Sequence, residues 1–282
     1  MWKWDAIGEP KAVAVILHNA YEYHAWYAWL IDKLRNEGFQ VVMGDLPGHG
    51  ELNRGLKKHD EDFSSYYSFA AKMLEVAQSE QLPLFVIANG LGANIAIRTI
   101  FKNKTKIEID GLIVVSPWLQ LKVHPGKMPK TIASLGAITS NVKLKHDITL
   151  DDYTRYLEAQ QEMQDNIPFK PIVTVKWFTE LKNLIKLLKD YDEIKIPDIP
   201  VLVMTGAEDR IIDHHAPVQW LVAQKLSSFQ YKEWPEAKHS LFFEVEREEV
   251  FKFTCDFMVN HIRKEKTIAK YELTKKLKDS KN

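Results

Sequence analysis

One stretch of this 282-residue chain decides its fold, and it reads Phe85-Val86-Ile87-Ala88-Asn89-Gly90-Leu91-Gly92-Ala93. Its apolar beginning is typical of a buried strand, its glycines of a sharp turn, and its small residues of the start of a helix. This order matches the G-x-S-x-G turn, which presents a nucleophilic serine between a strand and a helix. Gly90 occupies the serine position, so the turn has its small neighbours but lacks the hydroxyl group.

Apolar runs alternate with helical patterns on both sides of this turn. The expected strands are 12–17, 39–43, 84–88, 111–116, 201–204 and 229–234. Apolar residues at helical spacing predict helices between them, for example over 66–77 and, at the end of the fold, over 250–261. This alternation indicates an α/β protein with a mostly parallel, doubly wound sheet that is covered on both faces. Ligands of such sheets bind outside the carboxyl ends of the strands.

The segment from about 119 to 199 breaks the alternation and is too long for a plain loop. We therefore expect residues 1–118 and 200–262 to form the core, and 119–199 to be an inserted helical cap, or lid, over the active edge of the sheet. Residues 263–282 form a basic tail with eight Lys or Arg against three Asp or Glu. A solvated tail is the simpler interpretation, and weak contact with an anionic membrane surface is the alternative.

Composition excludes several classes of function. Lys plus Arg and Asp plus Glu both number 38, so the net charge is zero and a nucleic-acid partner is not expected. Cys255 is the single cysteine, which leaves no intrachain disulfide and no cysteine-based metal site. His214-His215 lacks a nearby ligand set, so no metal and no cofactor are expected. Without a signal run or a long apolar segment, a cytoplasmic protein is expected. The pattern does not predict an oligomeric state.

Two further residues follow strands in the order that a serine, histidine and carboxylate triad requires. Asp209 comes after the strand at 201–204, with Glu208 and Asp213 as weaker alternatives. A carboxylate there can hold a histidine in the productive tautomer. His239 follows the strand at 229–234 and is the candidate general base. The catalytic candidates are thus Gly90 at the nucleophile position, Asp209 and His239.

The turn after the first strong strand supplies the candidate oxyanion hole. The backbone N–H groups of Ala20 and Leu91 are the expected donors, and they do not depend on the missing serine. Four side chains that follow strands are candidates for lining a pocket: His18, Asn19, Asn89 and Trp118. For Trp118 the alternative is a core residue of the cap.

At this point the chain resembles the α/β-hydrolase superfamily, and within it the bacterial monoacylglycerol lipase and lysophospholipase branch, a serine aminopeptidase-type family. Residues 18–23 resemble the family's HG-x-x-E loop and 43–50 its D-x-x-G-x-G loop. Residues 206–209 resemble its G-x-x-D motif, and His239 stands where the family has its histidine. The likeness spans about residues 1–262. It implies an α/β-hydrolase fold with a cap, a carboxylic ester or monoacyl lipid as substrate, and ester hydrolysis as the ancestral activity.

The chain departs from the family in two places, at Gly90 for the serine and at Asn19 for the glycine of the HG pair. Neighbours of Gly90 also differ from the family's G-H-S-M-G-G, which indicates a natural loss rather than an introduced one. Three hypotheses follow: an impaired hydrolase that still binds a lipid or ester, an enzyme in which the His239 and Asp209 pair acts as general base on water or on a substrate proton, and a non-catalytic interaction protein. Cys255 and Ser240 are poor replacements for the serine.

Overall fold

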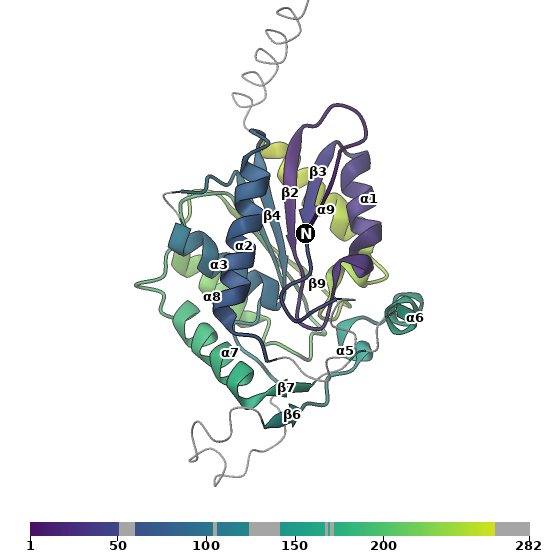
Figure 1. Cartoon of the computed structure of the whole chain (residues 1–282), viewed down its shortest axis with the longest axis vertical. Coiled ribbons are helices and arrows are strands. Elements are labelled where there is room, and N and C mark those ends of the chain that lie inside the picture. The colour runs from purple at the N-terminus through teal and green to yellow at the C-terminus, as the bar shows by residue number, and fades with distance from the viewer. Residues whose placement is uncertain (51–59, 104–105, 124–141, 167–168, 170–171, 263–282) are drawn as a thin grey trace, which may run out of the picture.

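The computed structural model describes residues 1–50, 60–103, 106–123, 142–166, 169 and 172–262 (Figure 1). The basic tail expected at 263–282, and part of the segment expected as a cap, lie outside the described residues. Among the described residues, no helix combines the length and the apolar character needed to cross a bilayer.

A seven-stranded sheet in the order β1-β3-β2-β4-β5-β8-β9 forms the centre of the fold. The strands are β1 (Trp2–Trp4), β2 (Ala12–Leu17), β3 (Phe39–Met43), β4 (Leu84–Asn89), β5 (Gly111–Val115), β8 (Val201–Gly206) and β9 (Phe229–Trp234). Only the edge strand β1 runs antiparallel, against β3. Every residue of β2, β4, β5 and β8 is buried, as expected for parallel strands covered on both faces.

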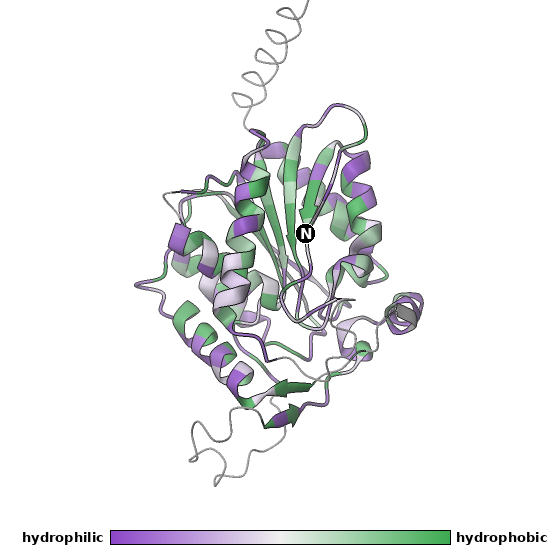
Figure 2. Cartoon of the chain, in the orientation of Figure 1, coloured by the Kyte–Doolittle hydropathy of each residue, from purple (hydrophilic) through white to green (hydrophobic). Residues whose placement is uncertain are grey.

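Helices cover the two faces of the sheet, and alternate strand residues pack against each face. One face carries α2 (Phe63–Gln78) and α3 (Leu91–Asn103), which pack on β2, and α8 (His215–Gln224), which packs on β8; Val13, Val15 and Leu17 belong to the core of this face. The other carries α1 (Ala28–Asn36), preceded by the 3-10 turn η1 (His24–Tyr27), and α9 (Arg247–Asn260), which pack on Ala12, Ala14 and Ile16. Figure 2 shows the apolar strands between helices that turn polar faces outward.

The elements between β5 and β8 gather at one end of the sheet, at the bottom of Figure 1. They are β6 (Lys143–Lys145), α5 (Leu150–Tyr153), α6 (Leu157–Asn166), β7 (Ile172–Thr174) and α7 (Val175–Leu188). Helix α7 buries Trp177, Leu181, Leu184 and Leu188, an i, i+4, i+7, i+11 stripe. Thr174 caps it by accepting from the Trp177 N–H at 3.2 Å. The Trp177 indole donates to the Tyr66 hydroxyl of α2 at 2.9 Å, which fastens α7 to the core.

The sequence predicted the α/β class, the mostly parallel sheet and six of its strands to within two residues, and these predictions are confirmed. It missed β1, whose three residues are too few to show a period. It also missed the β6–β7 pair, because Lys143–Lys145 offers a single buried side chain, Leu144.

Candidate active site

The turn after β4 has the backbone conformation that the sequence predicts. Gly90 lies at the junction of β4 and α3 with φ of 52°, in the left-handed region where glycine costs least. Gly92 is required by close approach, because a Cβ there would lie 2.4 Å from the Leu17 carbonyl oxygen and 2.5 Å from that of His18. Strand β2 and helix α3 can therefore pack tightly around position 90.

The structure brings Asp209 and His239 together. Asp209 Oδ2 and His239 Nδ1 are 2.7 Å apart, and both side chains are fully buried. The other carboxylate oxygen accepts from the backbone N–H groups of Ile211 and Ile212 at 2.8 and 3.0 Å. Of the two alternatives, Glu208 is exposed and Asp213 binds the side chain of Gln120 instead. Asp209 is thus the carboxylate that orients His239, in the geometry of an acid and base pair.

The second nitrogen of His239 is already engaged. The Trp118 indole Nε1, which can only donate, lies 3.1 Å from His239 Nε2. His239 Nε2 therefore accepts this hydrogen bond with the lone pair that a general base would use. The His239 ring has no exposed surface, and Tyr153 of α5 packs edge-on against it with 5.7 Å between ring centroids.

The candidate oxyanion hole is formed, and a side chain of the protein fills it. Asn19 Oδ1 accepts from the backbone N–H of Ala20 at 2.8 Å and from that of Leu91 at 2.8 Å. These are the two donors predicted from the sequence to bind the oxygen of a substrate. Asn19 was expected only to line a pocket, but its amide carbonyl takes the place that a substrate carbonyl oxygen would occupy.

The same side chain occupies the volume of the missing serine. A Cβ on Gly90 would lie 2.0 Å from Asn19 Oδ1, 2.2 Å from its Cγ and 2.7 Å from its Nδ2. All three distances are shorter than a real Cβ contact permits. The two departures from the family pattern, Asn19 and Gly90, are therefore linked by packing, since the Asn19 side chain fills the space that a side chain at position 90 would need.

The Glu22 side chain links the loop that contains Asn19 to the loop that contains Ser240. Its Oε2 accepts from the Asn19 backbone N–H at 3.0 Å and from the Tyr27 hydroxyl at 2.5 Å, while its Oε1 accepts from Ser240 Oγ at 3.3 Å. The side chain is buried, and this burial raises the pKa of its carboxyl, with the hydrogen bonds acting in the opposite direction. The sequence pattern contains this residue as the glutamate of the HG-x-x-E loop.

Two of the predicted pocket residues are placed in structural roles. His18 Nε2 accepts from the Leu46 backbone N–H at 2.8 Å, and its Nδ1 bonds the Asn19 carbonyl at 2.7 Å. Asn89 Nδ2 donates to the Tyr27 hydroxyl at 3.1 Å, on the face of the sheet covered by α1. Both side chains thus make hydrogen bonds within the protein, and their role in lining a pocket stays a prediction. Cys255 lies in α9 within the core of that same face, where burial raises the pKa of its thiol to about 11.

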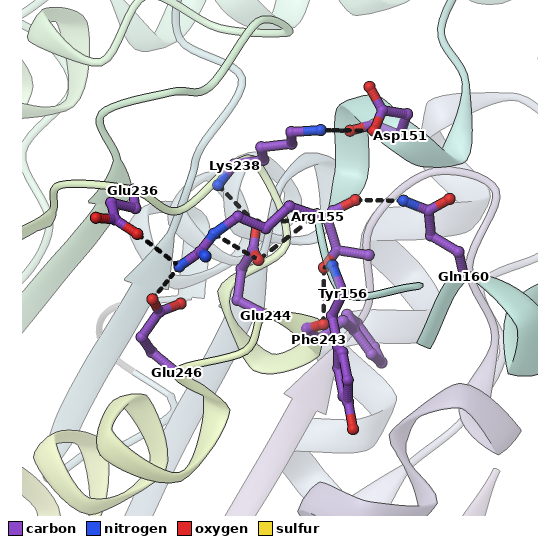
Figure 3. Close-up of polar contacts among 10 residues, drawn as sticks. Asp151, Arg155, Tyr156, Gln160, Glu236, Lys238, Phe243, Glu244 and Glu246 are labelled. Atoms are coloured by element: carbon purple, nitrogen blue, oxygen red, sulfur yellow. Dashed lines mark hydrogen bonds and ion pairs between the residues drawn. The ribbon is translucent and has the colours of Figure 1, made fainter. Parts of the chain in front are cut away.

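A charged cluster fastens the loop of His239 to the segment around α5 (Figure 3). The Glu244 carboxylate accepts from the Lys238 backbone N–H at 2.7 Å and from the Arg155 backbone N–H at 3.3 Å. The Arg155 guanidinium reaches Glu236 at 3.5 Å and also contacts Glu246. Lys238 Nζ binds Asp151 Oδ1 at 2.7 Å. The cluster ties two segments that are about 85 residues apart in sequence and so closes the site over His239.

An apolar groove lies beside this closed centre, between Trp118 and helix α7. Tyr21, Leu121, His146, Val173 and Phe178 are among the residues that line it. Tyr21 belongs to the same loop as Asn19 and has a positive φ of 66°. His146, which sequence reasoning missed, comes from the loop after β6 and bonds the Tyr21 hydroxyl through Nε2. No group of three or more His, Cys, Asp or Glu side chains that could hold a metal ion occurs within the described ranges.

A mostly parallel sheet with the nucleophile, acid and histidine positions at three strand ends, in this chain order, defines an α/β-hydrolase fold. The chain belongs to the family described as serine aminopeptidase, S33, whose model matches residues 8–246.

Relatives agree with this membership, and solved structures share the fold. Phospholipase YtpA of Bacillus subtilis is 32% identical over 93% of this chain and 100% of its own length. Monoglyceride lipase of Saccharomyces cerevisiae is 26% identical, over 93% and 88%. The crystal structure of a soluble variant of that yeast lipase with a substrate analogue has a TM-score of 0.76 at 21% identity, covering 93% of this chain and 90% of the other. Paleococcus ferrophilus monoacylglycerol lipase has a TM-score of 0.74 at 22% identity, over 92% and 98%.

A serine placed at position 90 alone should not fit. Gly90→Ser adds a Cβ where the Asn19 amide lies, so we expect the free energy of unfolding to fall by about 1–3 kcal/mol, and we expect no esterase activity. Gly90→Ala is the matched control, because it adds the same Cβ without a hydroxyl and should lose as much. Urea denaturation of both variants, with and without Asn19→Gly, measures the effect. If Asn19→Gly restores no stability to either variant, the packing link between the two positions is wrong.

Glu22 should give the protein a specific pH dependence. Its pKa in the folded state is raised, mainly by burial, above the ordinary value of 4.5, so the folded protein takes up this proton at a higher pH than the unfolded chain. Between those two pKa values stability therefore rises as pH falls. In Glu22→Gln the amide can keep the same acceptor and bond Ser240, yet it does not titrate. We expect the unfolding free energy of wild type minus that of Glu22→Gln to increase as pH falls from 7 towards 4.5. A constant or shrinking difference in urea denaturation over this range would contradict the assignment.

Proposed function

We propose that this protein binds a monoacyl lipid or a related carboxylic ester and does not hydrolyse it through an acyl-enzyme. The observation that carries the proposal is the position of the Asn19 amide, whose oxygen accepts from both candidate oxyanion donors beside a nucleophile position without a hydroxyl. Family membership supplies the class of ligand, and the geometry of Asn19 supplies the argument against turnover.

The loss of the nucleophile alone already removes most of the rate. In serine hydrolases the loss of a triad member leaves roughly 10³–10⁴-fold catalysis over water, which comes from the oxyanion hole and from substrate binding. Gly90 removes the nucleophile, and Asn19 competes for the oxyanion hole that provides the remainder. In subtilisin, loss of one oxyanion donor costs roughly 10²–10³ in kcat. Both losses act on the same chemical step, so their separate effects on kcat cannot be multiplied together.

The Asn19 amide oxygen is also hard to displace from the two backbone N–H groups that it binds. A substrate carbonyl would have to replace an amide that is covalently attached one residue from Ala20, and therefore has a high effective concentration at the hole. The displaced Asn19 side chain would then need new partners in a buried place. Release of this side chain costs about 1–3 kcal/mol where its amide oxygen finds no new partner, because a buried polar group left unpaired carries that penalty.

Several observations support retention of a lipid or ester site. The relatives include proteins named phospholipase and monoglyceride lipase, and the groove beside Trp118 is lined mostly by apolar side chains. We also propose that residues 119–199 act as a cap, since α5 and α7 meet the core over the carboxyl ends of the strands. The alternative route, with His239 as general base on water, has weaker support because Trp118 engages His239 Nε2.

Labelling with a fluorophosphonate probe tests the proposal. We expect no stoichiometric labelling of wild type or of Gly90→Ser. In the double variant Asn19→Gly/Gly90→Ser the hole is emptied and a hydroxyl is restored beside the Asp209 and His239 pair, so we expect labelling at residue 90, located by peptide mass spectrometry.

The triple variant that adds His239→Ala is the control, because it should lose the base and with it the label. Stoichiometric labelling of wild type, or release of fatty acid from a monoacylglycerol at a rate typical of esterases, would contradict the proposal. A folded double variant that remains unlabelled would show that Asn19 is not what blocks the site.

A further inference from the structure

The groove beside α7 contains few polar side-chain atoms, and nearly all of them are committed within the protein. The Trp177 indole donates to the Tyr66 hydroxyl at 2.9 Å, and the Trp118 indole donates to His239. The Tyr21 hydroxyl and His146 Nε2 bond one another. His146 Nδ1 is buried and has no hydrogen-bond partner among the described residues. Of the described residues that line this groove, it is therefore the single side-chain nitrogen or oxygen without a partner.

His146 is well placed to act as a fixed, neutral group. Its side chain is about 5% exposed, and its ring packs on Tyr21 with 5.2 Å between ring centroids. Burial lowers the pKa of the imidazole to about 4, with the charge of Asp147 acting in the opposite direction. The ring is thus uncharged near pH 7, with one nitrogen protonated and the other a lone-pair acceptor.

The Tyr21 hydroxyl decides which nitrogen carries the proton. Burial raises the pKa of this phenol, so the hydroxyl keeps its hydrogen and has it available to donate. Imidazole nitrogen is a strong acceptor, and Nε2 is the atom that faces the hydroxyl. The proton of the neutral ring is then on Nδ1, which leaves a buried N–H donor without a partner on a residue that lines the apolar groove. A buried donor without a partner is costly, and a ligand oxygen removes that cost.

We propose that His146 Nδ1–H binds the carbonyl oxygen of a monoacyl ester, while the acyl chain lies along the apolar wall formed by Leu121, Val173, Phe178 and Leu181. This inference rests on the proposed function and names how the ligand is recognised. In an active relative the carbonyl binds the oxyanion hole, but here Asn19 fills that hole. The carbonyl needs a different donor, and His146 provides the one that the groove still offers.

The groove favours a neutral acceptor oxygen over a charged headgroup. A carboxylate would be buried beside an uncharged imidazole, and the described side chains that line the groove include no cation. An ester carbonyl accepts one hydrogen bond at little desolvation cost. The proposal therefore predicts a preference for an ester over an otherwise matched ether, because the ether lacks the carbonyl group.

Binding of two matched probes tests the proposal. The probes are 1-monolauroylglycerol, which has the carbonyl, and 1-O-dodecylglycerol, which has the same chain length without it, both kept below their aggregation concentrations. We expect wild type to bind the ester about threefold to tenfold more tightly than the ether in titration calorimetry. His146→Phe keeps a ring but loses the donor, and it should bind both probes alike. His146→Asn, whose amide nitrogen lies near the place of Nδ1, should restore the preference.

Release of lauric acid is followed in the same samples, which separates this inference from the proposed function. Hydrolysis by wild type would overturn the proposed function, because that function excludes turnover. An ester preference that persists in His146→Phe would overturn the role of His146 while leaving the proposed function intact. Absence of any binding of 1-monolauroylglycerol to folded wild type would overturn the inference as well, since it requires this probe to occupy the groove.

Discussion

Two backbone N–H groups, those of Ala20 and Leu91, point into a buried space where no strand or helix can satisfy them. In an esterase such unpaired donors stabilise the substrate oxygen that gains negative charge during the reaction. In this protein Asn19 Oδ1 accepts from both N–H groups, with two hydrogen bonds of 2.8 Å. This one amide links the loop after β2 to the start of α3, and it fills the space that a side chain at position 90 would need.

The surroundings of Asn19 have kept the arrangement of a catalytic site. Asp209 holds His239, Glu22 ties the Asn19 backbone to Tyr27 and Ser240, and Gly92 lets the strand and helix approach. Each of these contacts is buried and also stabilises the fold, so each can outlast the loss of the nucleophile. His239 Nε2 accepts from the Trp118 indole, and this hydrogen bond links the loop after β5 to the loop after β9.

The sequence predicted the fold class, the family, and the residues that the structure gathers around Gly90. It succeeded there because those residues follow buried strands, and a parallel sheet places all such ends at one edge. It could not predict what the Asn19 side chain does, since a side-chain rotamer depends on the empty volume at Gly90, 71 residues away in sequence. The two departures from the family pattern were visible, but only their contact shows that they are one structural change. His146 was missed because its loop lies in the irregular segment, where no period or motif marks a residue.

The measurement that most directly tests this account is the scalar coupling across a hydrogen bond in NMR, between the Leu91 amide nitrogen and the Asn19 side-chain carbonyl carbon. The account predicts a measurable coupling in wild type, together with slow exchange of the Leu91 amide hydrogen. No coupling, with a Leu91 amide that exchanges rapidly with water, would show that the hole is open and would contradict the account.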